Sequence, residues 1–293
     1  MPSSVTELLD LLDLECIDPN LYRGKQPDTQ LQRVFGGQVA ASALVAAART
    51  VDAERPVHSL HSYFLRPGDP GVPIIYDVEA LRDGRSFATR RVVARQHGHA
   101  IFYLTASFHV VEEGLDHAEP MPDVRDPEDC ISIAEVFRAR SPERAAHWER
   151  EWSALEVRYA GSSKPQGGME IGEHVAQQRL WIRVAGELSD DPLEHTAVLA
   201  FASDLTLLGS ALVPHGISIG SPKLQPASLD HAMWFHRPLR ADDWWLYDQA
   251  SPTAVGSRGL ALARVFTRDG ALAATVAQEG LIRLRDDRGG QGA

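Results

Sequence analysis

The hexapeptide SYFLRP at residues 62–67 returns as MWFHRP at residues 233–238, and this repetition decides the fold. Arg66 and Arg237 stand 171 residues apart within these motifs. At the next turn-forming glycines, Gly98 and Gly270, the spacing is 172. Near-constant spacing between similar segments is the signature of a repeated structural unit. The chain of 293 residues is therefore predicted to contain two copies of one fold.

Each copy contains one long apolar segment followed by strand-like runs. The segments 37–48 and 198–213 have almost no polar face, which is typical of a buried helix. Runs of alternating character follow, in chain order 72–81, 87–96 and 101–111 in the first copy and 244–250, 259–267 and 271–284 in the second. A buried helix wrapped by an antiparallel sheet is the simplest packing for each copy, which predicts an α+β fold.

The segment between the copies is predicted to be a surface linker. Residues 114–140 are richer in Asp, Glu and Pro, and Ser141-Pro142 then begins a helix with proline at its first position. We expect Trp148, Trp152 and Leu155 to share one face of that helix and to dock it onto the protein. The predicted division is 1–115 for the first, non-catalytic copy, 116–150 for the linker with the start of its helix, 151–288 for the catalytic copy, and 289–293 for a disordered tail.

Composition excludes several classes of function. A net charge of -11 with a pI near 5.5 disfavours general binding to nucleic acid. Cys16 and Cys130 form neither a disulfide framework nor a CxxC pair. Ser4 and Glu7 have capping-box spacing, so the first residues predict an amphipathic helix and no secretory leader. Polar residues interrupt the longest apolar runs, so we expect no membrane span and a cytoplasmic protein.

Asp204 is the only charged residue in the run AVLAFASDLTLLGSALVP at residues 197–214. An ionised carboxylate is costly to bury unless it is paired or hydrogen-bonded. One interpretation is a functional carboxylate. The other is an exposed helix cap, because Ser203 and Asp204 both suit the start of a helix.

Comparison of the two copies favours the functional interpretation. Three polar residues of the second copy face different residues in the first: Asp204 faces Gln38, Gln278 faces Ala106, and Ser228 faces Val57, or Ser59 if a gap of two residues is allowed. Two copies that share a fold for structural reasons alone would not need polar residues in one copy only. The second copy is therefore predicted to carry the chemistry.

The three residue types suit the activation of water. A carboxylate near a helix N-terminus is favoured in its ionised form and can accept a proton, so Asp204 is the candidate base. The Ser228 hydroxyl and the Gln278 amide can hold and polarise a water molecule beside an electrophilic carbonyl. Backbone N–H groups near Gly36 and Gly37, or near Asp204 itself, could stabilise the oxyanion.

Several segments, in order, resemble the bacterial acyl-CoA thioesterase II (TesB) family. They are FGGQ at 35–38, HSYFLRP at 61–67, DGRSF at 83–87, LDHAMWFHRP at 229–238 and QEG at 278–280. The resemblance implies a double hotdog, meaning two tandem hotdog repeats, each an antiparallel sheet wrapped around a long central helix. It also implies hydrolysis of fatty acyl-CoA to free fatty acid and CoA, without a cofactor. The family's catalytic Asp, Thr or Ser, and Gln fall on Asp204, Ser228 and Gln278, with Ser at a position that is commonly Thr.

Other residues are candidates for substrate binding or for competing chemistry. There is no GxSxG motif for an acyl-enzyme nucleophile. Two histidine pairs have odd separations that place their side chains on opposite strand faces, so no metal is expected. The densest basic stretch, Arg82 to Arg95, suits either phosphate contact or a solvated surface. The residues predicted to contact substrate are Gly36, Gly37, Gln38, His61 and Arg91.

A second class of function is a hotdog protein that binds acyl-CoA without turnover, or that hydrates an enoyl-CoA. Hydratases on this fold generally pair an Asp with a His in a short motif. The nearest histidines in sequence, His195 and His215, lie too far from Asp204 to form one. Sheet edges in hotdog folds commonly pair across subunits, so we expect a homodimer or homotetramer.

Overall fold

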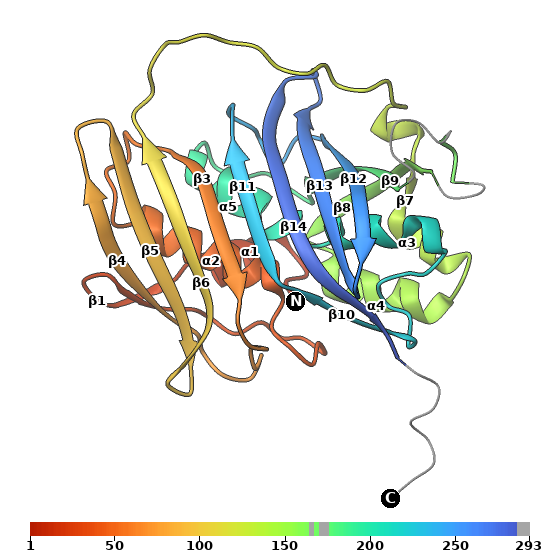
Figure 1. The fold of residues 1–293 in the computed structure, drawn as a ribbon, viewed down its shortest axis with the longest axis horizontal. Coiled ribbons are helices and arrows are strands. Elements are labelled where there is room, and N and C mark those ends of the chain that lie inside the picture. Colours follow the sequence, from red (N-terminus) through yellow and green to blue (C-terminus); the bar gives the residue numbers. More distant parts are fainter. Residues whose placement is uncertain (164–166, 170–175, 286–293) are drawn as a thin grey trace, which may run out of the picture.

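The computed structural model describes residues 1–163, 167–169 and 176–285, so the tail predicted at 289–293 lies outside the described residues. One antiparallel sheet of 14 strands runs through the described part of the chain (Figure 1). Its strands are β1 (Glu15–Asp18), β2 (Leu21–Arg23), β3 (Val57–Phe64), β4 (Ile75–Asp83), β5 (Phe87–Gln96), β6 (His99–His109), β7 (Ile131–Ser132), β8 (Leu155–Ser162), β9 (Gln177–Val184), β10 (Leu224–Ser228), β11 (Asp230–Phe235), β12 (Trp245–Val255), β13 (Arg258–Thr267) and β14 (Leu272–Leu284). The helices are α1 (Val5–Leu12), α2 (Gly36–Ala48), α3 (Ile133–Arg138), α4 (Pro142–Trp152) and α5 (Pro192–Ser203), with 3-10 helices η1 (Pro127–Asp129) and η2 (Leu207–His215).

The two predicted copies meet at the centre of this sheet. The strand order is β1-β2-β4-β5-β6-β3 for the first copy and β11-β14-β13-β12-β9-β8-β7 for the second, with β10 paired to β14. Strands β3 and β11 join the copies, with Leu60 opposite Met233. Each copy wraps its strands around an apolar helical segment, so the predicted α+β double hotdog is confirmed.

Helix α2 is the central helix of the first copy, as predicted for residues 37–48. Alanine, valine and leucine occupy every side of this helix, and its residues from Gly37 to Ala47 are buried. It packs against β3, β4, β5 and β6, and its end meets α5 of the second copy. Figure 1 shows α1, α2 and α5 behind one face of the sheet. The core therefore lies between the sheet and these helices.

The central segment of the second copy is not the single helix predicted over residues 198–213. Helix α5 begins at Pro192, with Asp191 as its N-cap, and ends at Ser203. After a turn at residues 204–206, the segment continues as the 3-10 helix η2, which packs against β12 and β13. The Tyr247 hydroxyl donates to the Ser203 carbonyl at 2.7 Å, so that carbonyl has a tertiary partner where the helix ends. The broken helix places Asp204 in the turn.

The whole segment Pro192–His215 is long and apolar enough to cross a membrane by length and composition. In the fold, however, 72% of its most apolar 18-residue window is buried inside the protein. A core helix of a double hotdog has this composition because protein surrounds it on all sides.

The linker between the copies contains more structure than predicted. Residues after β6 pass over the sheet as an extended loop (Figure 1), and the chain then forms η1, β7 and α3 before α4. Ser141 caps α4 as predicted, and Trp152 packs edge-on against Phe35 at 4.8 Å between ring centroids. Leu155, however, belongs to β8 and not to the helix. Trp148 and Trp152 therefore form the docking face without it.

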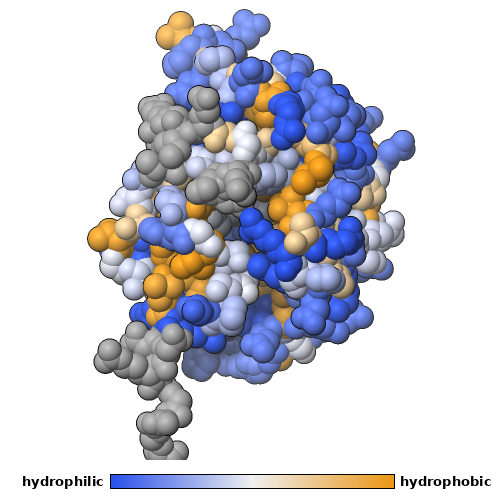
Figure 2. Space-filling model, turned by 90° about the vertical axis from the view of Figure 1, so that its right-hand side faces the viewer, coloured by the Kyte–Doolittle hydropathy of each residue, from blue (hydrophilic) through white to orange (hydrophobic). Residues whose placement is uncertain are grey.

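The remaining surface of the second copy is mixed in character. Figure 2 shows the end of the molecule that carries the second copy, where apolar residues form small groups between hydrophilic ones.

Near the N-terminus, Ser4 caps α1 by accepting from the Glu7 N–H at 3.2 Å. The Glu7 carboxylate accepts from Ser3 and not from Ser4, so the predicted cap is present but the capping box is shifted by one residue.

Candidate active site

Asp204, Ser228 and Gln278 lie together although they come from separate elements. Ser228 donates its hydroxyl hydrogen to Asp204 Oδ1 at 3.2 Å. The Gln278 amide Nε2 donates to the same carboxylate oxygen and to Ser228 Oγ, the latter at 3.0 Å. The three side chains thus form a closed triangle of hydrogen bonds. The structure brings together the three residues that the sequence predicted.

Strand pairing explains how Ser228 and Gln278 meet. Ser228 is the last residue of β10 and lies opposite Gly280 of β14. The chain then leaves β10, and the Leu229 N–H donates to the Glu279 carbonyl at 3.0 Å before β11 begins. Gln278 points to the inner face of β14 and is 0% exposed. β10 and β11 both run antiparallel to β14, with a one-residue shift in register between Ser228 and Ala232, and this irregularity places the Ser228 hydroxyl beside the buried Gln278 amide.

Asp204 lies at the end of its own helix and not at its start. It is the C-cap residue of α5, so the prediction of a helix N-terminus in its own segment is wrong, and so is the exposed N-cap. The helix start comes from the other copy instead: the Gly37 N–H, in the first turn of α2, donates to the carboxylate. The first N–H groups of a helix are free of intrahelical partners and favour an anion.

Gly36 and Gly37 allow this contact between the copies. A Cβ atom on Gly36 would lie 2.6 Å from Asp204 Oδ2, and one on Gly37 would lie 2.2 Å from the Phe201 carbonyl oxygen. Both distances are shorter than any side chain tolerates, so only glycine lets α2 approach the end of α5 this closely. The two glycines of the FGGQ motif thus allow the first copy to contact the carboxylate of the second copy.

Burial controls the ionisation of Asp204. Desolvation raises the pKa of this carboxyl to about 6, although hydrogen bonds from Gln278, Ser228 and Gly37 oppose the shift. Asp204 is half-buried and does not itself line the groove, but its hydrogen-bond partner Ser228 does. A carboxylate with a pKa near neutrality is a stronger base than an ordinary surface aspartate.

His231 and Tyr247 hold the turn that carries Asp204, and sequence reasoning did not assign them this position. His231 Nε2 shares a hydrogen bond of 2.8 Å with Ser203 Oγ, and burial lowers the pKa of this imidazole to about 4. Tyr247 bonds the Ser203 carbonyl. The one sequence signal for this position is that His231 falls within the segment LDHAMWFHRP at 229–238.

A groove of about 320 Å³ lies beside Ser228 and is formed by both copies. Its lining includes Gly36 and Phe64 from the first copy and Ser228 and Leu229 from the second. The Phe64 N–H donates to the Leu229 carbonyl at 2.9 Å, which joins the two sides. Other lining residues are Arg33, Val34, Val39, Leu65, Arg66, Pro67, Gly68, Ile101, Phe102, Pro226 and Ala227.

Three predicted substrate contacts lie elsewhere. His61 is exposed and packs edge-on against Trp234 at 5.1 Å, while Arg91 lies over the Tyr103 ring at 5.8 Å. Neither residue lines the groove. Gln38 is buried in α2, where its Nε2 is 3.4 Å from the Lys25 carbonyl. Of the predicted contacts, the structure brings Gly36 and Gly37 to the site.

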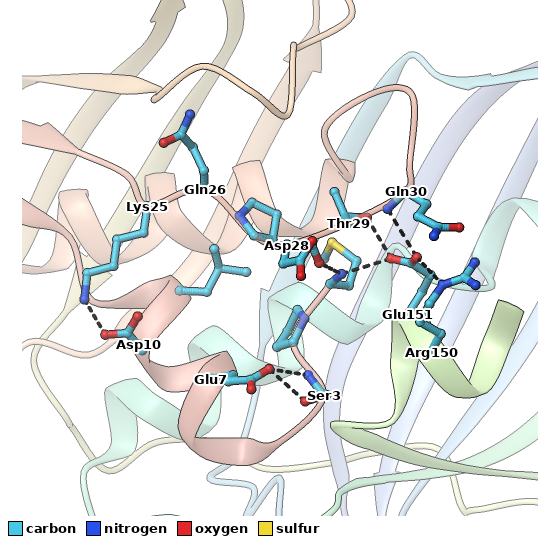
Figure 3. A pocket seen from close by; sticks show the side chains of 14 residues that line it. Ser3, Glu7, Asp10, Lys25, Gln26, Asp28, Thr29, Gln30, Arg150 and Glu151 are labelled. Carbon is cyan, nitrogen blue, oxygen red and sulfur yellow. Dashed lines mark hydrogen bonds and ion pairs between the residues drawn. The ribbon is translucent and has the colours of Figure 1, made fainter.

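A larger hollow, of about 430 Å³, is lined by α1, the loop before α2 and the end of α4 (Figure 3). Several of its charged groups are paired with one another or with neighbouring hydroxyls. Lys25 bonds Asp10 at 2.5 Å, and Glu151 accepts from Thr29 Oγ1 at 2.7 Å and from Arg150. Within the described ranges 1–163, 167–169 and 176–285, no group of three His, Cys, Asp or Glu side chains is placed to hold a metal ion. The groove at Ser228 is the better candidate for chemistry.

Comparison with known proteins identifies the family. A model of the acyl-CoA thioesterase N-terminal domain matches residues 25–109, and an acyl-CoA thioesterase model matches residues 151–281. The chain is 39% identical to acyl-CoA thioesterase 2 of Haemophilus influenzae, over 98% of this chain and 100% of that protein. It is 41% identical to acyl-coenzyme A thioesterase 8 of Mus musculus, over 94% of this chain and 88% of that protein.

Solved structures show the same fold. The crystal structure of an acyl-CoA thioesterase II, TesB2, from Mycobacterium marinum is 44% identical and has a TM-score of 0.81, covering 94% of this chain and 98% of that one. Fold and relatives together define the class as the double hotdog thioesterases. Within that class, the chain belongs to the acyl-CoA thioesterase family of the TesB type.

Proposed function

We propose that the protein hydrolyses fatty acyl-CoA to a free fatty acid and CoA at the triangle of Asp204, Ser228 and Gln278. The carrying observation is that one carboxylate, pKa about 6, accepts hydrogen bonds from a hydroxyl and an amide beside a groove. Membership in the acyl-CoA thioesterase family supports the substrate class.

The proposed reaction uses water as the nucleophile. Asp204 accepts a proton from water while the water oxygen attacks the thioester carbonyl carbon. The bond from that carbon to sulfur then breaks, and the CoA thiolate takes up the proton that Asp204 accepted, which restores the carboxylate. The Gln278 Oε1 atom is buried and has no protein partner within the described residues, so it can accept the second hydrogen of the attacking water.

The start of α2 supplies the hydrogen-bond donor that stabilises the oxyanion. Gly36, the first residue of α2, lines the groove, and N–H groups in the first helical turn have no intrahelical partner. We assign the Gly36 N–H to the oxyanion, because Gly37 already donates to Asp204. Donors that are fixed before the reaction stabilise developing charge effectively.

The two copies are proposed to have different roles in catalysis. We propose that residues 151–288 form the catalytic copy and residues 1–115 a non-catalytic copy, joined by the linker at 116–150. One active site per chain then results, although both copies contribute groups to it. One alternative, hydration of an enoyl-CoA, would need a histidine bonded to Asp204, and the partners of this carboxylate within the described residues are Ser228, Gln278 and Gly37. The other alternative, acyl-CoA binding without turnover, is left to the experiment.

A thiol-release assay tests this function. Purified protein is mixed with short, medium and long acyl-CoAs, and free CoA is measured beside enoyl-CoA hydration. We expect CoA release from wild type, and loss of it in Asp204→Ala and Gln278→Ala variants that keep the wild-type circular dichroism spectrum. Tight acyl-CoA binding without CoA release would support the binding protein instead.

We also propose a homodimer or homotetramer in the cytoplasm. Large apolar side chains, including Tyr63, Trp234 and Leu262, are exposed on the outer face of the sheet, where a second copy could cover them. Light scattering on purified protein should give two or four times the chain mass of 32.1 kDa. A monomer at micromolar concentration would contradict this part.

A further inference from the structure

Two arginines stand at the rim of the groove that reaches Ser228. Arg33 and Arg66 both line the groove and both are exposed. Backbone bonds hold their segments together: the Val34 N–H, next to Arg33, donates to the Gly68 carbonyl at 3.0 Å. Arg66 lies two residues before Gly68 and two after Phe64, whose N–H bonds the neighbour of Ser228. The two guanidinium groups therefore belong to the same end of the groove.

Comparison of the two copies shows that Arg66, unlike its counterpart Arg237, has no ion pair within the described residues. Its sister Arg237 donates to the Leu272 carbonyl at 3.0 Å and also pairs with Asp116. Arg66 makes the equivalent bond, to the Ala100 carbonyl at 2.6 Å, but has no carboxylate partner among the described residues. Arg33 likewise has no ion pair in that part of the chain. Other arginines of the sheet, such as Arg90 with Asp83, are paired, and Arg91, which has no ion pair in the described ranges, does not line the groove.

We propose that Arg33 and Arg66 bind the phosphate groups of the CoA portion of the substrate. This inference rests on the proposed function and adds the binding site for the anionic end of the substrate. Guanidinium groups form charge-assisted, often bidentate hydrogen bonds with phosphate oxygens. The pantetheine arm separates the thioester from the phosphates, so the thioester lies at Ser228 while the phosphates lie at the exposed rim.

Charge supports the same assignment. The protein has a net charge of -11, and CoA is also strongly anionic, so general electrostatics oppose association. Unpaired cations at one end of the groove reverse this locally. None of the arginines in the basic stretch from Arg82 to Arg95 lines the groove: Arg85, for example, lies in the β4–β5 turn, whereas the groove uses the end of β3 and the start of β6.

The test compares three thioesters with one acyl chain: acyl-CoA, acyl-dephospho-CoA and acyl-pantetheine. For Arg33→Gln, Arg66→Gln and the double variant, we measure kcat and KM on each. The expected result is a higher KM for acyl-CoA with little change in kcat, because binding is lost equally in the ground and transition states. Each exposed contact should change the preference for acyl-CoA over acyl-pantetheine by roughly threefold to tenfold. The effect should shrink at high salt.

Two control variants accompany the test. Arg237→Gln removes the sister backbone bond, and Arg85→Gln removes a cation at the far end of the sheet; neither should change the preference. Acyl-dephospho-CoA lacks only the 3′-phosphate and therefore identifies the phosphate that each arginine binds. A variant that loses the wild-type preference for acyl-CoA over acyl-dephospho-CoA has lost a contact with the 3′-phosphate, and one that is weakened equally on both has lost a contact with the diphosphate.

An unchanged preference in the double variant would overturn the assignment, whether its rates were normal or uniformly reduced. Binding of CoA alone, measured by calorimetry, should also weaken in the double variant. This measurement can be made even if wild type cleaves no thioester. That result would overturn the proposed function, and the phosphate site would then stand only if CoA binds wild type more tightly than it binds the double variant.

Discussion

The central segments of the two copies start from similar apolar sequences and end in different structures. In the first copy, α2 is a continuous helix from Gly36 to Ala48 whose polar residue near the start, Gln38, is neutral. In the second copy, α5 ends at Ser203, Asp204 occupies the turn, and η2 completes the packing against the sheet. The unbroken helix contributes its N-terminus, and the broken one contributes the carboxylate.

This difference teaches how a duplicated fold can produce a single site. A carboxylate at the end of α5 alone would be destabilised by that helix dipole. The Gly37 N–H of α2 supplies the missing stabilisation from the other copy. Neither copy therefore contains a complete site.

The largest effect is expected at Asp204. An Asp204→Asn variant keeps the shape of the side chain but cannot accept a proton, so kcat should fall by roughly 10²- to 10⁴-fold. Gln38→Ala, at the sister position, should change kcat far less. CoA release by the two variants checks this prediction, and similar rates for both would contradict the difference between the copies.

A smaller but still large effect is expected where α2 meets α5. Gly37→Ala would place a methyl group 2.2 Å from the Phe201 carbonyl oxygen and must push the helices apart. We expect a loss of about 1–3 kcal/mol in the free energy of unfolding, and a lower kcat because the Gly37 N–H moves from Asp204. Gly209→Ala in η2, where a Cβ meets nothing within 4 Å, is the matched control. Denaturant unfolding and CoA release should separate the two, and equal behaviour would argue against close contact between the copies.

Ser228 tests the hydroxyl of the triangle. Ser228→Ala removes one hydrogen bond to Asp204 and should lower kcat by roughly fivefold to tenfold. Ser228→Thr keeps the hydroxyl and should retain most of the activity. Ser59→Ala, in the first copy, serves as the control. If Ser228→Ala kept the full wild-type rate, the hydroxyl would have no role in orienting water.

The smallest effect concerns stability. Burial raises the folded-state pKa of Asp204 from 3.8 to about 6, so the ionised carboxylate destabilises the fold above pH 6 and this cost disappears below about pH 3.8. Asp204→Asn should therefore gain about 1–2 kcal/mol near pH 8, a value discounted because part of the residue is exposed. The gain should vanish near pH 4. Urea unfolding at both pH values measures it, and a variant that is less stable at pH 8 would contradict the account.

Much of the fold was predictable because its signals are local or repeated. The motif spacing gave the duplication, the apolar segment 37–48 gave α2, and β5 was predicted with its observed bounds. The break after Ser203 was not predictable, because the hydrogen bond from Tyr247 that accompanies it comes from a strand 44 residues away. Composition alone favoured one continuous helix there.

The sequence predicted which three side chains of the candidate site come together, but not the groups that surround them. The contrast between Asp204 and Gln38 predicts from sequence which copy is reactive, and this assignment stays a prediction. The donation from Gly37 required knowledge of how two copies pack, as did the placement of Arg33 and Arg66 beside one groove. Arg91 and His61 are equally suitable by residue type, and only the sheet geometry places them away from the groove.

The most direct test of the account is the pH dependence of kcat/KM for an acyl-CoA between roughly pH 5 and 8.5. Asp204 must be ionised to accept a proton, and its folded pKa is about 6. Activity should therefore be constant above pH 7 and fall about tenfold per unit below pH 6. Gln38→Ala should show the same profile. A profile without an ionisation near pH 6, or one that Gln38→Ala shifts, would contradict the claim that a single buried carboxylate in the second copy is the base.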